Sequence, residues 1–147
     1  MRNRVAVLHG VNLDALDRRP AEHYGGLTFA QLEYRIEQFA RELALEPSFF
    51  QSNHEGEYVE ELHRSPDYAD ALVLNPGAWT HYAWALRDAL EVSGLPAVEV
   101  HLSDVEGREE FRRRSVLADV TVGRVAGKGV DGYREALSHL KEVLAGS

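Results

Sequence analysis

The 147-residue chain contains no cysteine. Without thiols it can form neither a disulfide nor a thiolate metal site, and it cannot use a cysteine nucleophile. Long hydrophobic runs are also missing. The apolar stretch near the N-terminus extends only from Val5 to Leu8, which is too short for a signal peptide or a membrane span. We therefore expect a cytoplasmic protein with no disulfides and no membrane partner.

Positive charge is scarce as well. Lys and Arg total 16 against 24 Asp and Glu, so the formal net charge at pH 7 is -8. An acidic chain is a poor nucleic-acid ligand unless a local basic patch compensates for its charge. The one dense basic stretch, Arg108 to Arg114, is interrupted by Glu109, Glu110 and Phe111, and its simplest interpretation is a solvated surface. No nucleic-acid partner is expected.

Glycine-rich nucleotide signatures are absent too. The residues after the first apolar stretch fit neither G-x-G-x-x-G nor G-x-x-x-x-G-K-[ST], which disfavours dinucleotide and P-loop phosphate sites. His54 and His63 are too scattered to suggest a metal site, and we interpret them as surface residues. The sequence therefore predicts no cofactor and no metal.

What the sequence does contain is an alternation of apolar strands and amphipathic helices. Hydrophobic residues make up 44% of the chain, and its length suits one domain over residues 1–147. Thr28 and Gln31 form a capping box before the first helix, and Thr80 and Gly94 are the expected ends of a later helix. Strands are predicted over 5–8, 48–51, 71–74, 97–102 and 120–125, and helices over about 28–46, 55–64, 80–94 and 132–144.

This alternation predicts the fold. Strands separated by helices form parallel sheets with helices on both faces, and right-handed crossovers leave few topologies. We predict a flavodoxin-like α/β three-layer sandwich with a five-stranded parallel sheet of order 2-1-3-4-5. Ligands of such sheets bind beyond the carboxyl ends of the strands. The residues that follow the strands are therefore the candidate site.

Polar side chains follow three of these strands. They are Asn12, Arg18, Arg19 and Tyr24 after the first, Asn75 and His81 after the third, and Glu99, His101, Ser103, Arg108 and Arg112 at and after the fourth. Glu99 and His101 are two apart in a strand, so their side chains should point the same way. A carboxylate beside an imidazole stabilises the protonated ring, which suits a general acid, although a plain surface pair is the alternative.

Two arginines of the group are spaced for a helix. Arg108 and Arg112, four residues apart, would share a helical face. They could bind a carboxylate substrate, or they could be ordinary surface charge.

Several short motifs occur in order along the chain. They are His9-Gly-Val-Asn-Leu13, Arg19 with Tyr24-Gly25, Gln51-Ser-Asn-His-Glu-Gly56, Asn75-Pro-Gly-Ala-Trp-Thr-His81, Leu86-Arg-Asp-Ala89, Val98-Glu-Val-His-Leu-Ser103 and Arg108-Glu-Glu-Phe-Arg112. With these motifs the chain resembles the type II 3-dehydroquinate dehydratases over nearly its whole length. The resemblance implies a cofactor-free hydro-lyase of the shikimate pathway, assembled as a homododecamer of four trimers. Whether it serves aromatic amino acid biosynthesis or quinate breakdown stays open.

The resemblance also implies a base. Tyr24 would take a proton from the carbon next to the substrate ketone, with Arg19 and Arg108 favouring its tyrosinate form. Asn12 would hold a water molecule that stabilises the resulting enolate. A free tyrosine has a pKa near 10, so an enzyme that uses tyrosinate needs such positive neighbours.

An acid and a set of substrate contacts are implied in the same way. His101, oriented by Glu99, would protonate the departing hydroxyl group. Asp88 would reach the site of a neighbouring subunit. The residues that would contact the substrate are Asn75, His81, Leu102, Ser103 and Arg112.

The chain departs from the family pattern at several positions. Val11 and Asp17 stand where proline and glycine are usual, and Arg18-Arg19-Pro20 stands where Arg-Glu-Pro is usual, so Arg18 remains an alternative to Arg19. Glu106-Gly107 replaces His-Ala. Asp104 replaces asparagine, and an unpaired carboxylate there would repel the substrate carboxylate and raise KM.

These departures leave two other hypotheses open. The first is a catalytically impaired or repurposed paralogue that binds a small hydroxy-carboxylate. The second is a flavodoxin-like binding module for a nucleotide or a flavin, which the missing phosphate loop disfavours.

Overall fold

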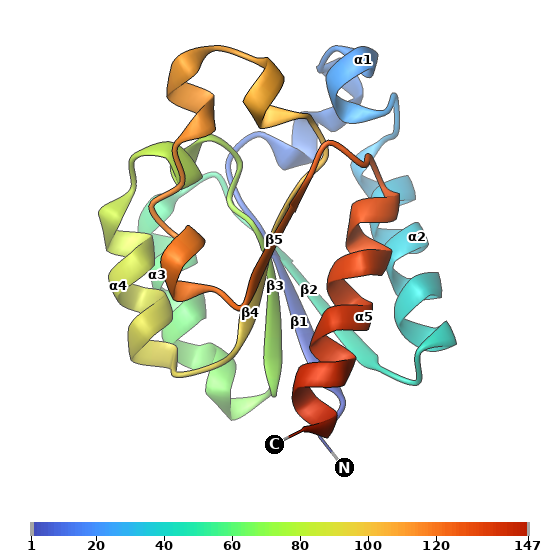
Figure 1. Cartoon of the computed structure of the whole chain (residues 1–147), viewed down its shortest axis with the longest axis vertical. Coiled ribbons are helices and arrows are strands. Elements are labelled where there is room, and N and C mark those ends of the chain that lie inside the picture. Colours follow the sequence, from blue (N-terminus) through green and yellow to red (C-terminus); the bar gives the residue numbers. More distant parts are fainter. Residues whose placement is uncertain (1, 147) are drawn as a thin grey trace.

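A parallel sheet lies at the centre of the computed structural model, which describes residues 2–146 (Figure 1). Its order is β2-β1-β3-β4-β5, and every neighbouring pair of strands is parallel. The predicted flavodoxin-like topology is therefore confirmed. The strands are β1 (Arg4–His9), β2 (Glu46–Gln51), β3 (Ala71–Asn75), β4 (Ala97–His101) and β5 (Gly123–Ala126).

Helices cover both faces of the sheet. α2 (Phe29–Glu42) and α5 (Asp131–Ala145) lie on one face, and α3 (Glu55–Arg64) and α4 (Trp84–Ser93) lie on the other (Figure 1). Successive side chains of a strand point to opposite faces. Val5 and Val7 of β1 accordingly pack with α2 and α5, whereas Ala6 and Leu8 pack with α3 and α4. Burial of these two apolar cores is the main favourable term in folding.

One predicted helix start is wrong. Thr80 belongs to a 3-10 helix, η3 (Gly77–His81), and α4 begins only at Trp84. The Thr80 hydroxyl donates a hydrogen bond to Glu99 instead of capping a helix. Gly94 does follow the last residue of α4, with a left-handed φ of 69°.

The largest other boundary differences are at the end of α2 and at the start of β5. The Thr28–Gln31 capping box is present, but α2 ends at Glu42 because Ala44 adopts a φ of 59° and turns the chain into β2. Pro47 is tolerated inside β2 because this strand is at the edge of the sheet. β5 starts at Gly123 rather than at residue 120, since residues 118–120 form a 3-10 turn, η6 (Ala118–Val120).

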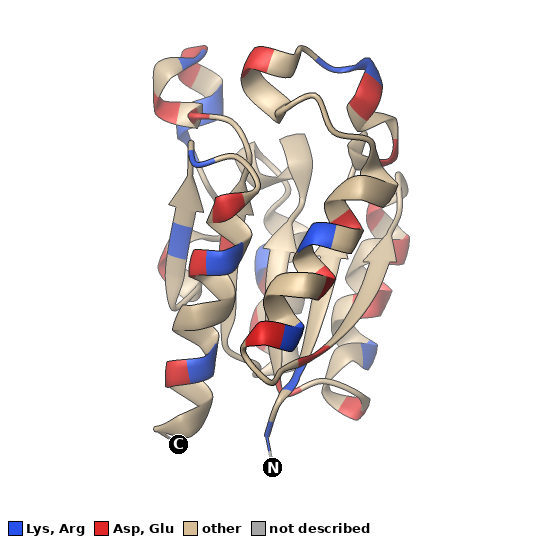
Figure 2. Ribbon diagram, turned by 90° about the vertical axis from the view of Figure 1, so that its right-hand side faces the viewer, with Lys and Arg blue, Asp and Glu red and all other residues tan. Residues whose placement is uncertain are grey.

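Short helices occupy the loops beyond the carboxyl ends of the strands, at the top of Figure 1. In the short helix that follows β1, Leu13 and Leu16 are buried and pack against the core. In Figure 2, acidic and basic residues are interspersed along the helices, and the strands behind them are mostly uncharged. Within residues 2–146, no helix is long and apolar enough to span a bilayer. The short helices at this edge are η1 (Leu13–Arg18), α1 (Ala21–Tyr24), η3, η4 (Val105–Gly107) and η5 (Glu110–Arg113).

Candidate active site

A cavity at the carboxyl edge of the sheet gathers most of the predicted site residues. Its walls come from the segments that follow β1, β3 and β4. This is the position expected for a ligand site in an open parallel sheet. The predicted residues in its lining are Asn12, Arg19, Tyr24, Asn75, His81, His101, Leu102, Ser103, Arg108 and Arg112.

Tyr24 receives hydrogen bonds from two arginines of distant segments. Arg19 Nη2 donates to the Tyr24 hydroxyl oxygen at 2.5 Å, and Arg108 Nη1 donates to the same oxygen at 2.7 Å. The Arg19 guanidinium also lies over the tyrosine ring, 4.2 Å from its centroid. Two guanidinium groups therefore direct their positive charge at one phenol oxygen. Arg18, in contrast, is exposed, so Arg19 is the arginine that contacts Tyr24.

The chain around Tyr24 holds the ring in place. Tyr24 ends the one-turn helix α1, which begins after Pro20 and is closed by Gly25 with a φ of 82°. A positive φ favours glycine because a side chain would be strained there. The tyrosine ring packs against the core formed with α2 and α5, while its hydroxyl reaches the two arginines.

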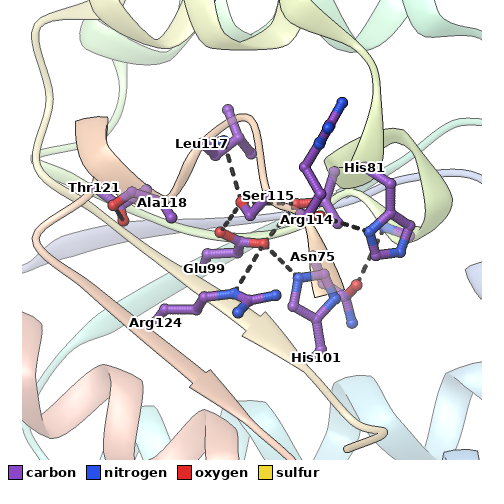
Figure 3. Close-up of polar contacts among 12 residues, drawn as sticks. Asn75, His81, Glu99, His101, Arg114, Ser115, Leu117, Ala118, Thr121 and Arg124 are labelled. Atoms are coloured by element: carbon purple, nitrogen blue, oxygen red, sulfur yellow. Dashed lines mark hydrogen bonds and ion pairs between the residues drawn. The ribbon is translucent and has the colours of Figure 1, made fainter. Parts of the chain in front are cut away.

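Glu99 and His101 lie side by side on β4, as the spacing predicted (Figure 3). His101 Nε2 donates to Glu99 Oε2 at 2.5 Å. Thr80 donates to the same oxygen at 2.5 Å, and Ser115 donates to Oε1 at 2.7 Å. Burial by itself would raise the pKa of Glu99, but the hydrogen bonds from His101 and the two hydroxyls outweigh it and lower that pKa to about 2. The ionised carboxylate places the His101 proton on Nε2.

Three groups around Glu99 were missed by sequence reasoning. Thr80 was assigned to a helix cap, and Ser115 lay in a segment with no predicted element. Arg124 faces Glu99 in the register of β4 and β5, with Nε 3.6 Å from Glu99 Oε2. Strand register is not visible in a single sequence, so no local signal could have found this contact.

Asn75 is held from behind by a buried chain of hydrogen bonds. Its Nδ2 donates to Tyr133 Oη at 2.9 Å, and Tyr133 Oη lies 2.9 Å from His9 Nε2. Burial lowers the pKa of His9 to about 3, so its ring is neutral and accepts the tyrosine proton. The side-chain oxygen Oδ1 of Asn75 accepts from the Gly77 N–H at 3.3 Å. His9 was noted only as part of a motif, and Tyr133 was not singled out.

The imidazole of His81 stacks on that of His101, with ring centroids 6.4 Å apart. His81 Nδ1 donates to the Arg114 carbonyl at 2.7 Å, which leaves Nε2 available. Burial is the main cause that lowers the pKa of His81. The edge of Phe111 packs against the same ring, with centroids 5.7 Å apart. His81 is therefore a neutral hydrogen-bonding group beside the His101 ring.

The predicted helical face of Arg108 and Arg112 is wrong. Arg108 is extended between η4 and η5, yet both side chains line the cavity. Arg112 also has an acidic partner, because its Nε lies 2.8 Å from Glu109 Oε2. Arg108 Nη1 approaches the Ser103 hydroxyl at 3.4 Å in addition to Tyr24.

Two carboxylates that were expected near the substrate, those of Asp88 and Asp104, do not line the cavity. Asp88 is exposed on α4 and is not among the lining residues. Asp104 lines a neighbouring hollow, where its side chain lies against Gly107 and Gly127. The expectation of a carboxylate directed at the substrate site is not supported for Asp104.

Asn12 enters the cavity from a backbone in the left-handed region, which asparagine adopts more readily than most residues. It has a φ of 69°, which is uncommon for a residue with a side chain. The Asn12 N–H donates to Asn53 Oδ1 at 2.8 Å, so the motif after β2 holds the loop after β1.

As for metals, no cluster of three or more His, Cys, Asp or Glu side chains is placed to hold an ion among residues 2–146.

Comparison with known proteins matches residues 3–141 to the family described as dehydroquinase class II. The chain is 47% identical over 135 residues to a 3-dehydroquinate dehydratase of Bacillus licheniformis, covering 92% of this chain and 93% of that protein. It is 49% identical over 141 residues to one of Thermotoga petrophila, covering 96% of each. The crystal structure of a type II dehydroquinase from Propionibacterium acnes superimposes with a TM-score of 0.89 at 39% identity, covering 97% of this chain and 98% of that one.

Proposed function

The chain belongs to the class II dehydroquinase family, and on that premise we propose that it removes water from 3-dehydroquinate to form 3-dehydroshikimate, with Tyr24 as the base and His101 as the acid. One observation carries the proposal. A single cavity contains a phenol oxygen held by two guanidinium groups and an imidazole backed by a buried carboxylate. These two groups are prepared for opposite proton transfers.

Proton removal is the first step of the proposed reaction. The Tyr24 oxygen takes a proton from the carbon next to the ketone, and the electrons of the C–H bond move to the ketone oxygen as an enolate. Arg19 and Arg108 compensate the negative charge of the tyrosinate before this transfer. Asn12, in the lining, holds the water molecule that stabilises the enolate.

Loss of the hydroxyl group is the second step. His101 donates a proton to the hydroxyl oxygen, the C–O bond breaks, and the enolate electrons return to form the ketone and the new C=C bond. Water leaves with the broken bond. Glu99 keeps the imidazole oriented and compensates its positive charge before the transfer.

Substrate binding falls to the polar residues around this pair. The terminal nitrogens of Arg112 are the groups proposed to bind the substrate carboxylate, since only its Nε is within 3.0 Å of Glu109. Asn75 presents its second N–H, because the first is committed to Tyr133. Leu102 lines the cavity with an apolar surface, and His81 and Ser103 supply contacts to the substrate hydroxyls.

Assembly is the further part of the proposal. Asp88 is exposed outside the cavity, so it can act on a substrate only from a second copy of the chain. Trp84, Asp88 and Val92 are spaced four apart on the exposed side of α4, and two of them are large apolar residues. We propose a homododecamer of four trimers. Light scattering should give the mass of twelve subunits, or of three if trimers separate, and a fully active monomer would contradict the proposal.

An ultraviolet assay for the conjugated enone product tests the activity directly. Purified protein should form the product from 3-dehydroquinate without added metal or nucleotide. No lysine lines the cavity within the described chain, so borohydride together with substrate should leave the enzyme active. Tight binding of 3-dehydroquinate without product would support the repurposed paralogue instead.

A further inference from the structure

A third charged residue contacts the Glu99–His101 pair from the neighbouring strand. Arg124 pairs with Glu99 in the register of β4 and β5. Its Nε lies 3.6 Å from Glu99 Oε2, the same oxygen that accepts the His101 hydrogen bond at 2.5 Å. Figure 3 shows the guanidinium beside the imidazole, with both groups directed at the carboxylate. Arg124 and His101 therefore lie against the same carboxylate oxygen, Arg124 through an ion pair and His101 through a hydrogen bond.

The Arg124 guanidinium has ion-pair contacts but lacks hydrogen bonds for two of its nitrogens within residues 2–146. Nε and Nη2 are buried without a hydrogen-bond partner in the part of the chain that the structure describes. Nη1 lies 3.6 Å from Oε1 of Glu106, whose side chain is 64% exposed. A cation in such a place costs free energy unless nearby carboxylates compensate it. Its electrostatic effect is consequently directed at Glu99 and its surroundings.

We propose that Arg124 is a positioning residue that makes His101 a stronger acid by competing with it for the Glu99 carboxylate. Part of the negative charge on Oε2 is compensated by Arg124, so the protonated imidazole gains less from it. The guanidinium also repels a second positive charge on the adjacent ring. Both effects favour release of the His101 proton to the leaving hydroxyl. This inference rests on the proposed function, in which His101 is the acid.

Other charged and titratable groups surround the pair, and their effects remain when Arg124 is changed. Among residues 2–146, the cationic side chains within 4.0 Å of Glu99 Oε2 are those of Arg124 and, when protonated, His101. Tyr58 of α3 interacts electrostatically with Glu99, and His81 of η3 stacks on His101. Arg112 of η5 acts on His81, and Glu106 of η4 lies against Arg124.

The kinetic test is Arg124→Met, which keeps a long side chain and removes the charge. Since kcat needs protonated His101, its alkaline limb should move to higher pH by about 0.5 to 1 unit. KM should stay within about twofold, because Arg124 is not in the cavity lining. Arg124→Lys should largely retain the wild-type profile. Arg64→Met removes an exposed positive charge at the end of α3 and should leave the profile unchanged.

A second readout does not depend on turnover. The imidazole nitrogens of His101 can be titrated by nitrogen-15 NMR, with the signal assigned through His101→Asn. The titration midpoint should rise in Arg124→Met. It should fall by a smaller amount in Glu106→Gln, because Arg124 then faces Glu99 without a competing carboxylate.

The possible outcomes separate the two proposals. A wild-type protein without turnover would overturn the proposed function, and the NMR titration would still decide the role of Arg124. An unchanged midpoint and kcat profile in folded Arg124→Met would overturn the present inference. If that variant does not fold, an unchanged midpoint in Glu106→Gln would overturn it equally.

Discussion

The two sides of the cavity are built in opposite ways. The acid side lies on a central strand, where Glu99 is fully buried and hydroxyls supplement the contact with His101. The base side lies on a one-turn helix between loops, and its hydroxyl is held by two arginines, one of them 84 residues away in sequence. Packing and strand register position the acid, whereas charge positions the base. Different substitutions and pH changes should therefore impair the acid side and the base side.

Tyr24→Phe should produce the largest loss, because it removes the base and keeps the packed ring. We expect kcat to fall by at least ~10²-fold, the usual consequence of losing a general base. Tyr34→Phe is the matched control, since Tyr34 is exposed and lies outside the cavity. Steady-state kinetics of both variants provide the measurement. A near-normal kcat in Tyr24→Phe would remove Tyr24 from the mechanism.

Glu99→Gln should impair the acid side because it removes the carboxylate that accepts the His101 hydrogen bond. It should also change how the stability of the protein depends on pH. The pKa of Glu99 falls from the ordinary 4.5 to about 2 in the folded protein. The ionised Glu99 carboxylate therefore stabilises the folded protein fully above about pH 5, and this contribution is lost as the pH falls toward 2. The loss amounts to about 3 kcal/mol in the free energy of unfolding. Denaturant titrations between about pH 5 and pH 2 should show that the free energy of unfolding of the wild type decreases by this amount. The Glu99→Gln variant should not show this decrease.

The control for this comparison is Glu60→Gln, which changes an exposed carboxylate on α3. It should show the pH dependence of the wild type. If the free energy of unfolding changed equally with pH in wild type and Glu99→Gln, Glu99 would not be an ionised, stabilising group.

Arg19→Ala should have an intermediate effect, because Arg108 still contacts Tyr24. Loss of one of two cations is expected to lower kcat by about tenfold. Arg18→Ala removes the same charge from an exposed neighbour and should stay within about twofold of wild type. Kinetics of this pair decide between the two arginines. An equal loss in both variants would show that overall charge matters rather than the contact with Tyr24.

Asp104→Asn should have the smallest effect. Its carboxylate lies against Gly107 and Gly127 outside the cavity, so the substrate carboxylate should be little affected. We expect KM to change by less than about twofold at low salt, because Asp104 is exposed and solvent screens its charge. A several-fold lower KM in the variant would show that the loop brings Asp104 into the site when substrate binds.

Much of the architecture follows from local sequence patterns. The alternation of apolar segments predicted the parallel sheet and its order, and the two-residue spacing of Glu99 and His101 predicted that they share a face. Such periodicities depend only on the geometry of a strand or helix. The motifs also led to Tyr24 and Arg19, although the contact between them could not be derived from either residue alone.

The contacts between elements were decided by the tertiary structure. Arg108 reaches Tyr24 only because the loops after β1 and β4 meet above the sheet, and Arg124 faces Glu99 only because β4 and β5 pair in one register. Thr80 could have capped a helix, but the buried Glu99 carboxylate requires its hydroxyl. A sequence specifies the face on which a side chain lies, because backbone geometry is local. The partner of that side chain depends on register and loop packing, which involve the whole chain.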